Sequence, residues 1–196
     1  MSTDSTAQKI ISAAEKLFAE NSYDGTSLRQ IAQAVGIKEP SIYAHFANKE
    51  AIYEAVIDRA LLPFFTEIHD WNKLQFSIRT LNDIPRRMLE LHCQQPYSAQ
   101  ILHREYSLPA DKINKKAMLW LEQIAEQSHQ FISSMNDAET SKEKSVARII
   151  ATTNITLGVF SSLGIQQRLL EDDYDKEKIF EEHVKVITRM FKSLML

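Results

Sequence analysis

Hydrophobic residues recur at helical spacing along most of this chain. The first stripe follows the i, i+1, i+4, i+7, i+8 order of one helix face: Ile10, Ile11, Ala14, Leu17 and Phe18. Ser5 and Gln8 form a capping box before it. Only four glycines and five prolines interrupt 196 residues. The pattern predicts an all-α protein with about nine helices.

The stretch Thr26–Glu50 predicts two short helices joined by a tight turn. Ser27 and Gln30 form a capping box, and an apolar face follows at Leu28, Ile31, Ala32 and Val35. Gly36 suits the left-handed residue that ends a helix, and Pro40 fits the first turn of the next one. This is the helix-turn-helix pattern, whose second helix can enter the major groove of DNA.

A longer helix is expected to connect this unit to the rest of the chain. Asn48 can cap it, and Pro63 lies inside its apolar pattern, where proline should kink or break a helix. We therefore expect a DNA-binding domain over residues 1–50. Residues 51–196 should form a larger helical domain for effector binding and dimerisation.

The second domain is divided by proline and capping signals. We interpret residues 70–81 as a helix end and a connection. Further helices are expected to begin near Asn82 or Asp83, at Pro96, at Pro109 and at Lys176. A capping box of Thr140 and Glu143 predicts one more helix, which reaches about Leu170.

Composition and charge limit where this protein works. The net charge is −3, and Cys93 is the only cysteine, which suits a reducing compartment. Met1–Gln8 has no basic region followed by an apolar run, so we expect no signal peptide and a cytoplasmic protein. Ile149–Gln167 is uncharged over 19 residues, about the length of a membrane span. Eight of these residues are Thr, Asn, Ser or Gln, so we expect a helix buried in protein and no membrane partner.

The last two helices carry the features of an interface. A stripe of mostly small residues on the first helix would allow close approach of another helix: Ala151, Ile155, Gly158 and Ser162. The apolar stripe on the second is wider than one contact needs and includes Val184, Ile187, Phe191 and Leu194. We expect these eight residues to form a homodimer interface, with an interior helix of a monomer as the alternative. A dimer suits a helix-turn-helix, since one such unit contacts few base pairs and pairs of them bind palindromic sites.

Residues 9–56 resemble the N-terminal domain of TetR-type transcription regulators. The resemblance rests on four motifs: Ile10-Ile11-x-Ala13-Ala14-x-x-Leu17-Phe18, Tyr23-Asp24-Gly25-Thr26-Ser27-Leu28-x-x-Ile31-Ala32, Val35-Gly36-Ile37 and Ser41-Ile42-Tyr43-x-His45-Phe46-x-x-Lys49-Glu50-x-Ile52. Pro40-Ser41 departs from the common glycine-containing form and bears on which bases are read. The rest of the chain matches by size and helical character only.

The resemblance implies a set of DNA-contacting residues. The expected base-facing positions are Lys38, Glu39, Pro40, Ser41 and Ala44. The expected phosphate contacts are Tyr43, His45 and Lys49, with support from Thr26, Ser27 and Arg29 on the preceding helix. Each of the phosphate contacts has an alternative: Tyr43 packs on the domain rim, His45 is a partly buried histidine, and Lys49 is only a solvated charge. Glu39 would accept from a cytosine amino group or exclude other sequences.

An effector site is also implied, since regulators of this type resemble ligand-gated switches. The candidates are aromatic and polar residues of the middle helices: Trp71, Phe76, His92, His103, Tyr106, Trp120, Asn154 and Phe160. They favour an apolar or aromatic small molecule. Asn154 lies in the uncharged stretch and, if buried, needs a hydrogen bond from a ligand, the partner subunit or a nearby threonine. Ligand binding would move the helix containing Pro63 and change the spacing of the two reading helices.

Other chemistry is not indicated. The six histidines form no H-x-x-x-H or H-E-x-x-H pair, and the chain has no G-x-S-x-G or phosphate-loop motif. We expect no metal, no cofactor and no enzymatic activity. The predicted function is a homodimeric, sequence-specific DNA-binding regulator, a repressor that a small molecule releases from a palindromic operator on double-stranded DNA. The alternative is a helical DNA-organising or protein-interaction module without ligand-controlled gene regulation, which the low positive charge favours.

Overall fold

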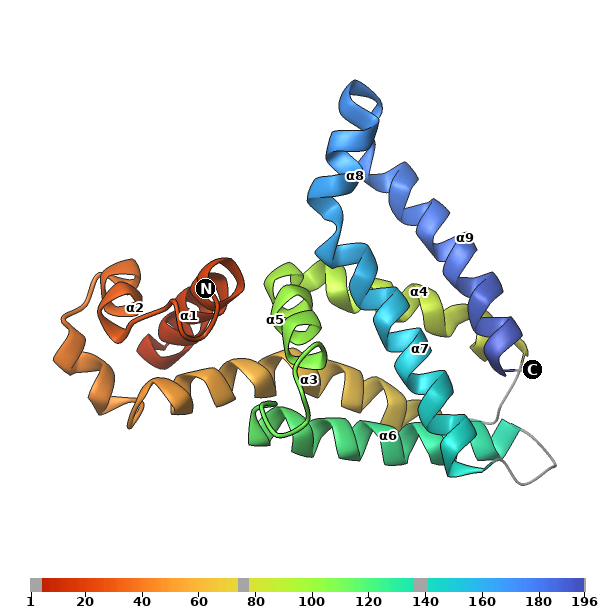
Figure 1. The fold of residues 1–196 in the computed structure, drawn as a ribbon, viewed down its shortest axis with the longest axis horizontal. Coiled ribbons are helices and arrows are strands. Elements are labelled where there is room, and N and C mark those ends of the chain that lie inside the picture. The colour runs from red at the N-terminus through yellow and green to blue at the C-terminus, as the bar shows by residue number, and fades with distance from the viewer. Residues whose placement is uncertain (1–4, 74–77, 136–140, 196) are drawn as a thin grey trace.

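A computed structural model of the chain describes residues 5–73, 78–135 and 141–195. Over these residues the chain forms nine α-helices and two short 3₁₀ helices, η1 and η2, without a strand. The all-α prediction is therefore confirmed. Figure 1 shows an elongated molecule with α1 and α2 at one end and α8 and α9 near the other.

The helix-turn-helix forms as the local signals predicted. It consists of α2 (Leu28–Val35) and η1 (Glu39–Ala44), and α1 (Thr6–Asn21) precedes it. Ser5 caps α1, and Ser27 and Gln30 form the full capping box of α2. Gly36 ends α2 at φ 78°, a left-handed conformation that glycine adopts without a steric penalty. These caps fix where each helix begins or ends.

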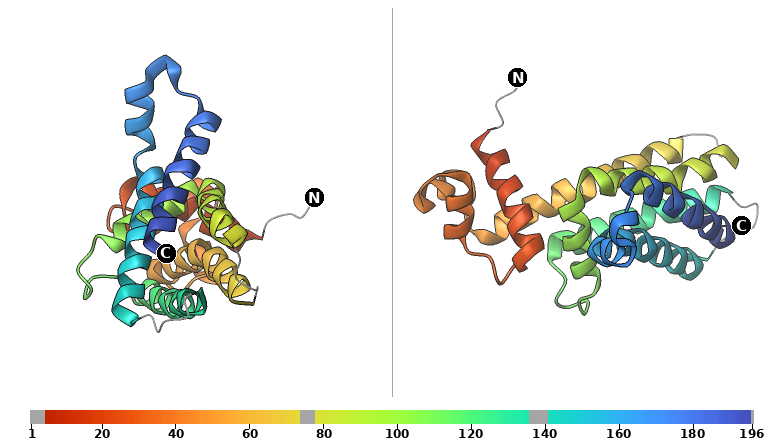
Figure 2. Two further views of the ribbon diagram at one scale, coloured as in Figure 1. Left: turned by 90° about the vertical axis from the view of Figure 1, so that its right-hand side faces the viewer. Right: turned by 90° about the horizontal axis from the view of Figure 1, so that it is seen from above.

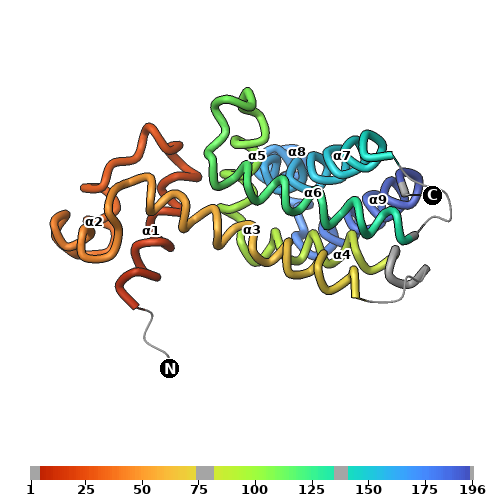
Figure 3. Tube along the Cα trace, turned by 90° about the horizontal axis from the view of Figure 1, so that it is seen from below, coloured from red at the N-terminus to blue at the C-terminus, as the bar shows by residue number. Residues whose placement is uncertain are grey.

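Helix α3 (Lys49–Lys73) runs from the helix-turn-helix into the second domain, as Figure 3 shows. Asn48 Oδ1 accepts the Ala51 N–H at 2.8 Å and caps it as expected. Pro63 does not break the helix, which continues for ten further residues. Buried side chains on both sides of the proline, including Leu61 and Phe64, hold α3 against its neighbours. Their packing outweighs the roughly 3 kcal/mol that an interior proline costs.

The second domain is built from the remaining helices. Their bounds are α4 (Ile78–Gln94), α5 (Pro96–Tyr106), α6 (Lys115–Met135), α7 (Lys142–Ser161), α8 (Leu163–Leu170), η2 (Glu171–Asp173) and α9 (Lys176–Met195). In Figure 1, α8 and the start of α9 project from the body as an arm, which we define as residues 163–183. Figure 2 shows the same projection from the side.

Two expected helix starts were wrong. Helix α4 begins at Ile78 and contains Pro85, so it starts before the expected Asn82 or Asp83. Helix α6 begins at Lys115, because Asn114 Oδ1 accepts the N–H groups of Lys116 and Ala117 at 2.9 and 3.3 Å. It does not begin at Pro109. At this position the cap, which satisfies free N–H groups, sets the helix start, and the upstream proline does not.

The expected long helix up to Leu170 is two helices. Ser141 caps α7 through the Lys144 N–H, whereas the expected cap Thr140 lies outside the described residues. Helix α7 ends at Ser161, and α8 leaves it at an angle of 55°. Among the described residues no single helix is long and apolar enough to cross a membrane, and only the bent pair of α7 with the segment up to Asp173 passes that test.

One cluster of buried side chains joins the two ends of the molecule. It runs from the helix-turn-helix through α3 to α5, α7 and α9, with members such as Ile10, Ile42, Ile57, Leu102 and Ile187. The division at residue 50 stays a prediction. The shared core places the helix-turn-helix and the helical domain in direct mechanical contact.

Candidate DNA-binding surface and ligand cavity

The second helix of the helix-turn-helix turns one side inward and leaves the rest in solvent. Ile42 is fully buried and Phe46 packs against the core. The exposed residues around this anchor are Lys38, Pro40, Ser41, Tyr43, Ala44 and His45, and Glu39 is half-buried. Tyr43 is 55% exposed, so it does not pack on the rim, and His45 is exposed rather than partly buried. Six of the predicted contacts therefore lie on an open surface.

Two further predicted contacts have partners inside the protein. Thr26 is 2% exposed, and its hydroxyl donates to the carbonyls of Leu17 and Ser22 at 3.1 and 2.8 Å. The Lys49 ammonium donates to the carbonyls of Tyr23 and Thr26 at 2.9 and 3.0 Å. The expected support of DNA by the Thr26 side chain is corrected, because burial removes it from the surface. A phosphate contact by Lys49 stays a prediction.

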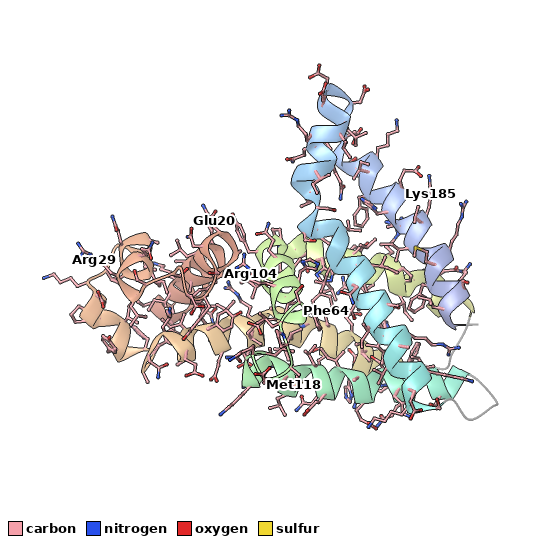
Figure 4. All side chains as sticks on the ribbon, viewed as in Figure 1. Glu20, Arg29, Phe64, Arg104, Met118 and Lys185 are labelled. Carbon is pink, nitrogen blue, oxygen red and sulfur yellow. The ribbon has the colours of Figure 1, made fainter. Side chains whose placement is uncertain are left out.

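The Ser27 and Arg29 side chains at the start of α2 differ in whether they have a partner inside the protein. Ser27 is exposed, but its hydroxyl belongs to the capping box with Gln30. Arg29 is exposed and, among the described residues, has no partner for its guanidinium. Figure 4 shows Arg29 at the far end of the molecule, with its side chain pointing outward. Arg29 and Lys38 are thus the cations available on this surface within the described residues.

Helix α5 holds the end of α1, a link that no sequence pattern indicated. The Arg104 guanidinium donates to the carbonyls of Phe18 and Ala19 at 2.8 and 3.1 Å. These carbonyls belong to the last turn of α1, whose partial negative charge favours a cation. Figure 4 places Arg104 between α5 and α1. This contact fastens the helix-turn-helix to the second domain.

Buried carboxylates extend this link. Glu15 of α1 is 8% exposed, pairs with Arg59 of α3 and accepts from the Ser98 hydroxyl at 2.6 Å. Glu105 of α5 accepts from the Tyr53 hydroxyl at 2.5 Å. Burial and this hydrogen bond raise the pKa of Tyr53, which keeps its hydroxyl protonated as the donor. These polar contacts join α1, α3 and α5.

Three adjoining cavities lie between α3, α4, α5, α6 and α7. Their volumes are about 270, 90 and 70 Å³, and Ile124 and Thr153 line all three. A fourth cavity, of about 600 Å³, lies under the arm between α4, α7, α8 and α9. The three adjoining cavities are named the ligand cavity below.

The expected effector residues separate into several groups. Trp71, His92, Tyr106 and Asn154 line the ligand cavity, and Phe160 lines the cavity under the arm. His103 and Trp120 line none of these, and the Trp120 indole N–H donates to Asp58 at 2.7 Å. Phe76 lies outside the described residues. Asn154 is exposed, and its amide donates to the Ile150 carbonyl of its own helix at 2.9 Å, so it is not a buried amide that needs a ligand or a partner subunit.

His92 is the most unusual of these residues. It is 4% exposed, and its ring lies 4.6 Å from that of Phe64 and 5.3 Å from that of Phe160. Its Nδ1 has no hydrogen-bond partner among the described residues. Burial lowers the pKa of His92 from 6.5 to about 4, so the ring is neutral at pH 7.

This pKa predicts an acid-sensitive fold. Between pH 6.5 and about 4 the unfolded chain binds a proton at His92 that the folded chain does not, so the free energy of unfolding falls as pH falls. Once the pH has fallen to about 4, this group has lowered the free energy of unfolding by about 3 kcal/mol. Above pH 6.5 it has no such effect. Urea unfolding of the wild type and His92→Phe at pH 7 and pH 4.5 measures it. The variant should lose less stability on acidification, and equal losses would contradict the prediction.

The expected dimer residues lie mostly inside the protomer. Val184, Ile187 and Phe191 are buried in its core, because α9 packs this face on α4 and α7. Their expected place in a dimer interface is therefore corrected. The expected residues Ala151, Ile155, Gly158, Ser162 and Leu194 are half-buried. Other apolar side chains of α7, α8 and α9 are exposed: Ile150 (55%), Ile165 (63%), Leu169 (77%), Val186 (51%) and Met190 (42%). No residue of α8 is buried.

These features define a class of protein: a helix-turn-helix unit carried by a long helix into an all-helical domain with internal cavities. Within residues 5–73, 78–135 and 141–195, no three His, Cys, Asp or Glu side chains cluster as metal ligands would. Residues 10–56 match the model of the family described as bacterial regulatory proteins, tetR family. The match covers most of α1, all of α2 and η1, and the start of α3, so this part of the chain is similar to a family of bacterial regulatory proteins.

Curated relatives support the match. Over 114 residues the chain is 33% identical to the biofilm operon icaADBC HTH-type negative transcriptional regulator IcaR of Staphylococcus epidermidis, covering 54% of this chain and 62% of that protein. It is 36% identical over 96 residues to IcaR of Staphylococcus aureus strain Newman, covering 44% and 51%. The matches thus span between half and two thirds of these relatives.

Solved structures share the fold over nearly all of the chain. A TetR-like transcriptional regulator from Rhodococcus sp. RHA1 matches with a TM-score of 0.68 at 17% identity, covering 100% of this chain and 96% of that one. The transcriptional regulator FadR from Bacillus subtilis, in complex with stearoyl-CoA, matches with a TM-score of 0.62 at 16% identity, covering 92% and 96%. At these identities the likeness concerns the fold alone.

Proposed function

We propose that this protein is a homodimeric, sequence-specific DNA-binding transcriptional regulator, and that a small molecule releases it from a palindromic operator. The observation that carries the proposal is the exposed surface of η1, held in place by buried Ile42. The family match over residues 10–56 and the description of the IcaR relatives as negative regulators support it. We place its action in the cytoplasm, because a repressor must reach the chromosome.

The surface of η1 favours recognition by a few well-placed contacts. Arg29 and Lys38 are its available cations, and residues 26–50 hold three basic and two acidic side chains, a net charge of +1. With so few cations, little of the affinity comes from counterion release. Hydroxyls of Ser41 and Tyr43 would position the protein on phosphates or bases. DNA binding should therefore depend only weakly on salt.

Dimerisation would use the exposed apolar residues of α7, α8 and α9. Ile165 and Leu169 lie four apart on α8, and Val186 and Met190 lie four apart on α9, so each pair forms a strip on one helix face. In a symmetric dimer the same strips of two copies meet. Two reading units held this way would face half-sites about 34 Å apart.

The effector would bind in the ligand cavity. This cavity lies beside α3, which reaches the reading unit, and α5, which holds α1 through Arg104. Tyr106 lines the cavity two residues further along α5. The complex of the Bacillus subtilis neighbour with stearoyl-CoA supports a small-molecule ligand in this fold. A ligand that favours another position of α5 would shift the reading units out of register.

A gel shift with DNA selected from a random library by the wild type tests the proposal. Tyr43→Ala should weaken binding about thirtyfold, because each of the two subunits loses one exposed contact worth about 1 kcal/mol. Lys49→Ala should also weaken binding, because it frees the loop that its ammonium holds. Lys73→Ala, at the far end of α3, is the charge-matched control and should bind like the wild type. Unchanged binding of both Tyr43→Ala and Lys49→Ala would contradict the assignment.

The low positive charge also favours a second candidate, a DNA-organising or protein-interaction module without ligand-controlled regulation. The same selection separates the two functions. A regulator should enrich one palindromic sequence. A DNA-organising protein should retain fragments without a common sequence, and an interaction module should retain none.

A further inference from the structure

We infer that the effector is an uncharged, mainly apolar small molecule with one hydrogen-bonding group, and that His92 and Tyr106 bind this group. The inference rests on the proposed release of the regulator by a small molecule. It names the chemical class of that molecule and two residues that select it.

The shape of the ligand cavity favours a slender apolar body. Its largest part, of about 270 Å³, is near the lower end of the volumes typical of small-molecule sites. Its walls are mostly apolar, with Ile124 shared by all three parts and Tyr106 shared by two of them. The outer part, beside α6 and α7, therefore adjoins the deeper part at His92, and a chain-like molecule would occupy both by moving the side chains of their shared wall.

The charges around the cavity favour a neutral ligand. Among the described residues that line its three parts, none is Lys or Arg, and Glu122 is the one that carries a charge. Glu122 is exposed, so it lies where the cavity meets solvent. A carboxylate or phosphate brought inside would lose its hydration without gaining a cation, which is costly.

Some polar groups in the wall are left without a partner, and those of His92 and Tyr106 point to the ligand's hydrogen-bonding group. His92 Nδ1 is buried and unpaired, and the Tyr106 hydroxyl has no hydrogen bond among the described residues. The neighbouring hydroxyls of Thr152 and Thr156 are instead satisfied by carbonyls of their own helix, at 2.8 and 3.1 Å. A buried polar group without a partner destabilises the fold, and a ligand that pairs with it gains binding free energy.

The protonation states suit a neutral partner as well. The low pKa of His92 keeps its ring uncharged at pH 7, so it offers one donor and one acceptor. Burial raises the pKa of Tyr106, so its hydroxyl stays protonated and can donate. Because both lie in one part of the cavity, an alcohol, amide or ester group on the ligand would match them.

Calorimetry on the full-length protein at pH 7.5 tests the class with four probes that share one chain length. These are 1-octanol, octanoate, octyltrimethylammonium and octanoyl-CoA. We expect 1-octanol to bind saturably and the three charged probes to bind at least about tenfold more weakly, a difference of about 1.4 kcal/mol. Equal or tighter binding of any charged probe would overturn the inference, as would an absence of 1-octanol binding.

Variants of the two wall residues test the assignment of the site. Tyr106→Phe and His92→Phe should each weaken 1-octanol binding about three- to tenfold, the value of one hydrogen bond. Tyr97→Phe, on the same helix but outside the ligand cavity, is the matched control and should bind 1-octanol like the wild type. Circular dichroism verifies that each variant is folded. If His92→Phe does not fold, the assignment of the site is tested by Tyr106→Phe alone. Wild-type binding by a folded Tyr106→Phe would overturn the assignment.

The ligand class and the release of DNA by a ligand are tested by separate experiments. Calorimetry without DNA decides the ligand class, and a gel shift of selected DNA with and without 1-octanol decides regulation. If 1-octanol binds through Tyr106 but does not release the DNA, the ligand class stands and effector release is wrong. If DNA binds but 1-octanol does not, the inference is wrong and DNA binding stands.

Discussion

Replacing Leu169 with glutamate should dissociate the proposed dimer and lower the affinity for operator DNA about a hundredfold or more. Leu169 is 77% exposed on α8, a helix with no buried residue, so the protomer should remain folded. In a symmetric interface the change brings two carboxylates close to the same apolar surface, and like charges juxtaposed in this way cost several kcal/mol. Sedimentation velocity reports the dimer, and a gel shift reports the DNA affinity.

Leu119→Glu is the matched control for this experiment. Leu119 is 50% exposed on α6, a helix that lies apart from the projecting α8 in Figure 1, and its replacement should leave the oligomeric state unchanged. If Leu169→Glu stays dimeric and binds DNA as tightly as the wild type, the dimer does not use α8. Loss of the dimer in Leu119→Glu instead would place the interface on α6.

Replacing Arg59 with alanine should lower the free energy of unfolding by about 3–5 kcal/mol. The change leaves the buried Glu15 carboxylate with the Ser98 hydroxyl as its remaining side-chain partner among the described residues, and an uncompensated buried charge is costly. Urea unfolding at pH 7 measures the effect. Adding Glu15→Gln to Arg59→Ala should restore part of the stability, because the amide carries no charge.

An exposed ion pair provides the comparison. Arg86 and Glu181 form a two-fold hydrogen-bonded contact, at 2.9 and 2.6 Å, but their side chains are 42% and 48% exposed. Solvent screens such a pair, so Arg86→Ala should cost no more than about 1 kcal/mol. Equal effects of Arg59→Ala and Arg86→Ala would show that burial does not set the strength of the Glu15 contact.

The helix-turn-helix was predictable from the sequence because its boundaries depend on neighbours within a few residues. The Ser27 capping box and the left-handed Gly36 each act over four residues or fewer, and the structure confirms both. The same holds for Asn48 at the start of α3. Boundaries failed where two local signals competed, as at Pro109 and Asn114, because sequence alone does not rank a proline against a cap.

The candidate sites were only partly predictable, because a residue type does not reveal its partner. Thr26 and Lys49 matched a DNA-binding motif, yet their polar groups hold the loop between α1 and α2. Val184 and Phe191 belong to a stripe wide enough for two neighbours, but periodicity does not say which side faces the protomer's own core. The contact of Arg104 with Phe18 joins residues 86 positions apart, a separation over which no local pattern operates.

Helix α5 gives one element two tasks, since Arg104 closes the end of α1 and Tyr106 lines the ligand cavity. A substitution chosen to change ligand preference would therefore alter the seating of the reading unit as well. Anyone adapting this protein as a biosensor should select variants on operator affinity and ligand response together. Selection for ligand response alone would enrich variants whose affinity for operator DNA is reduced.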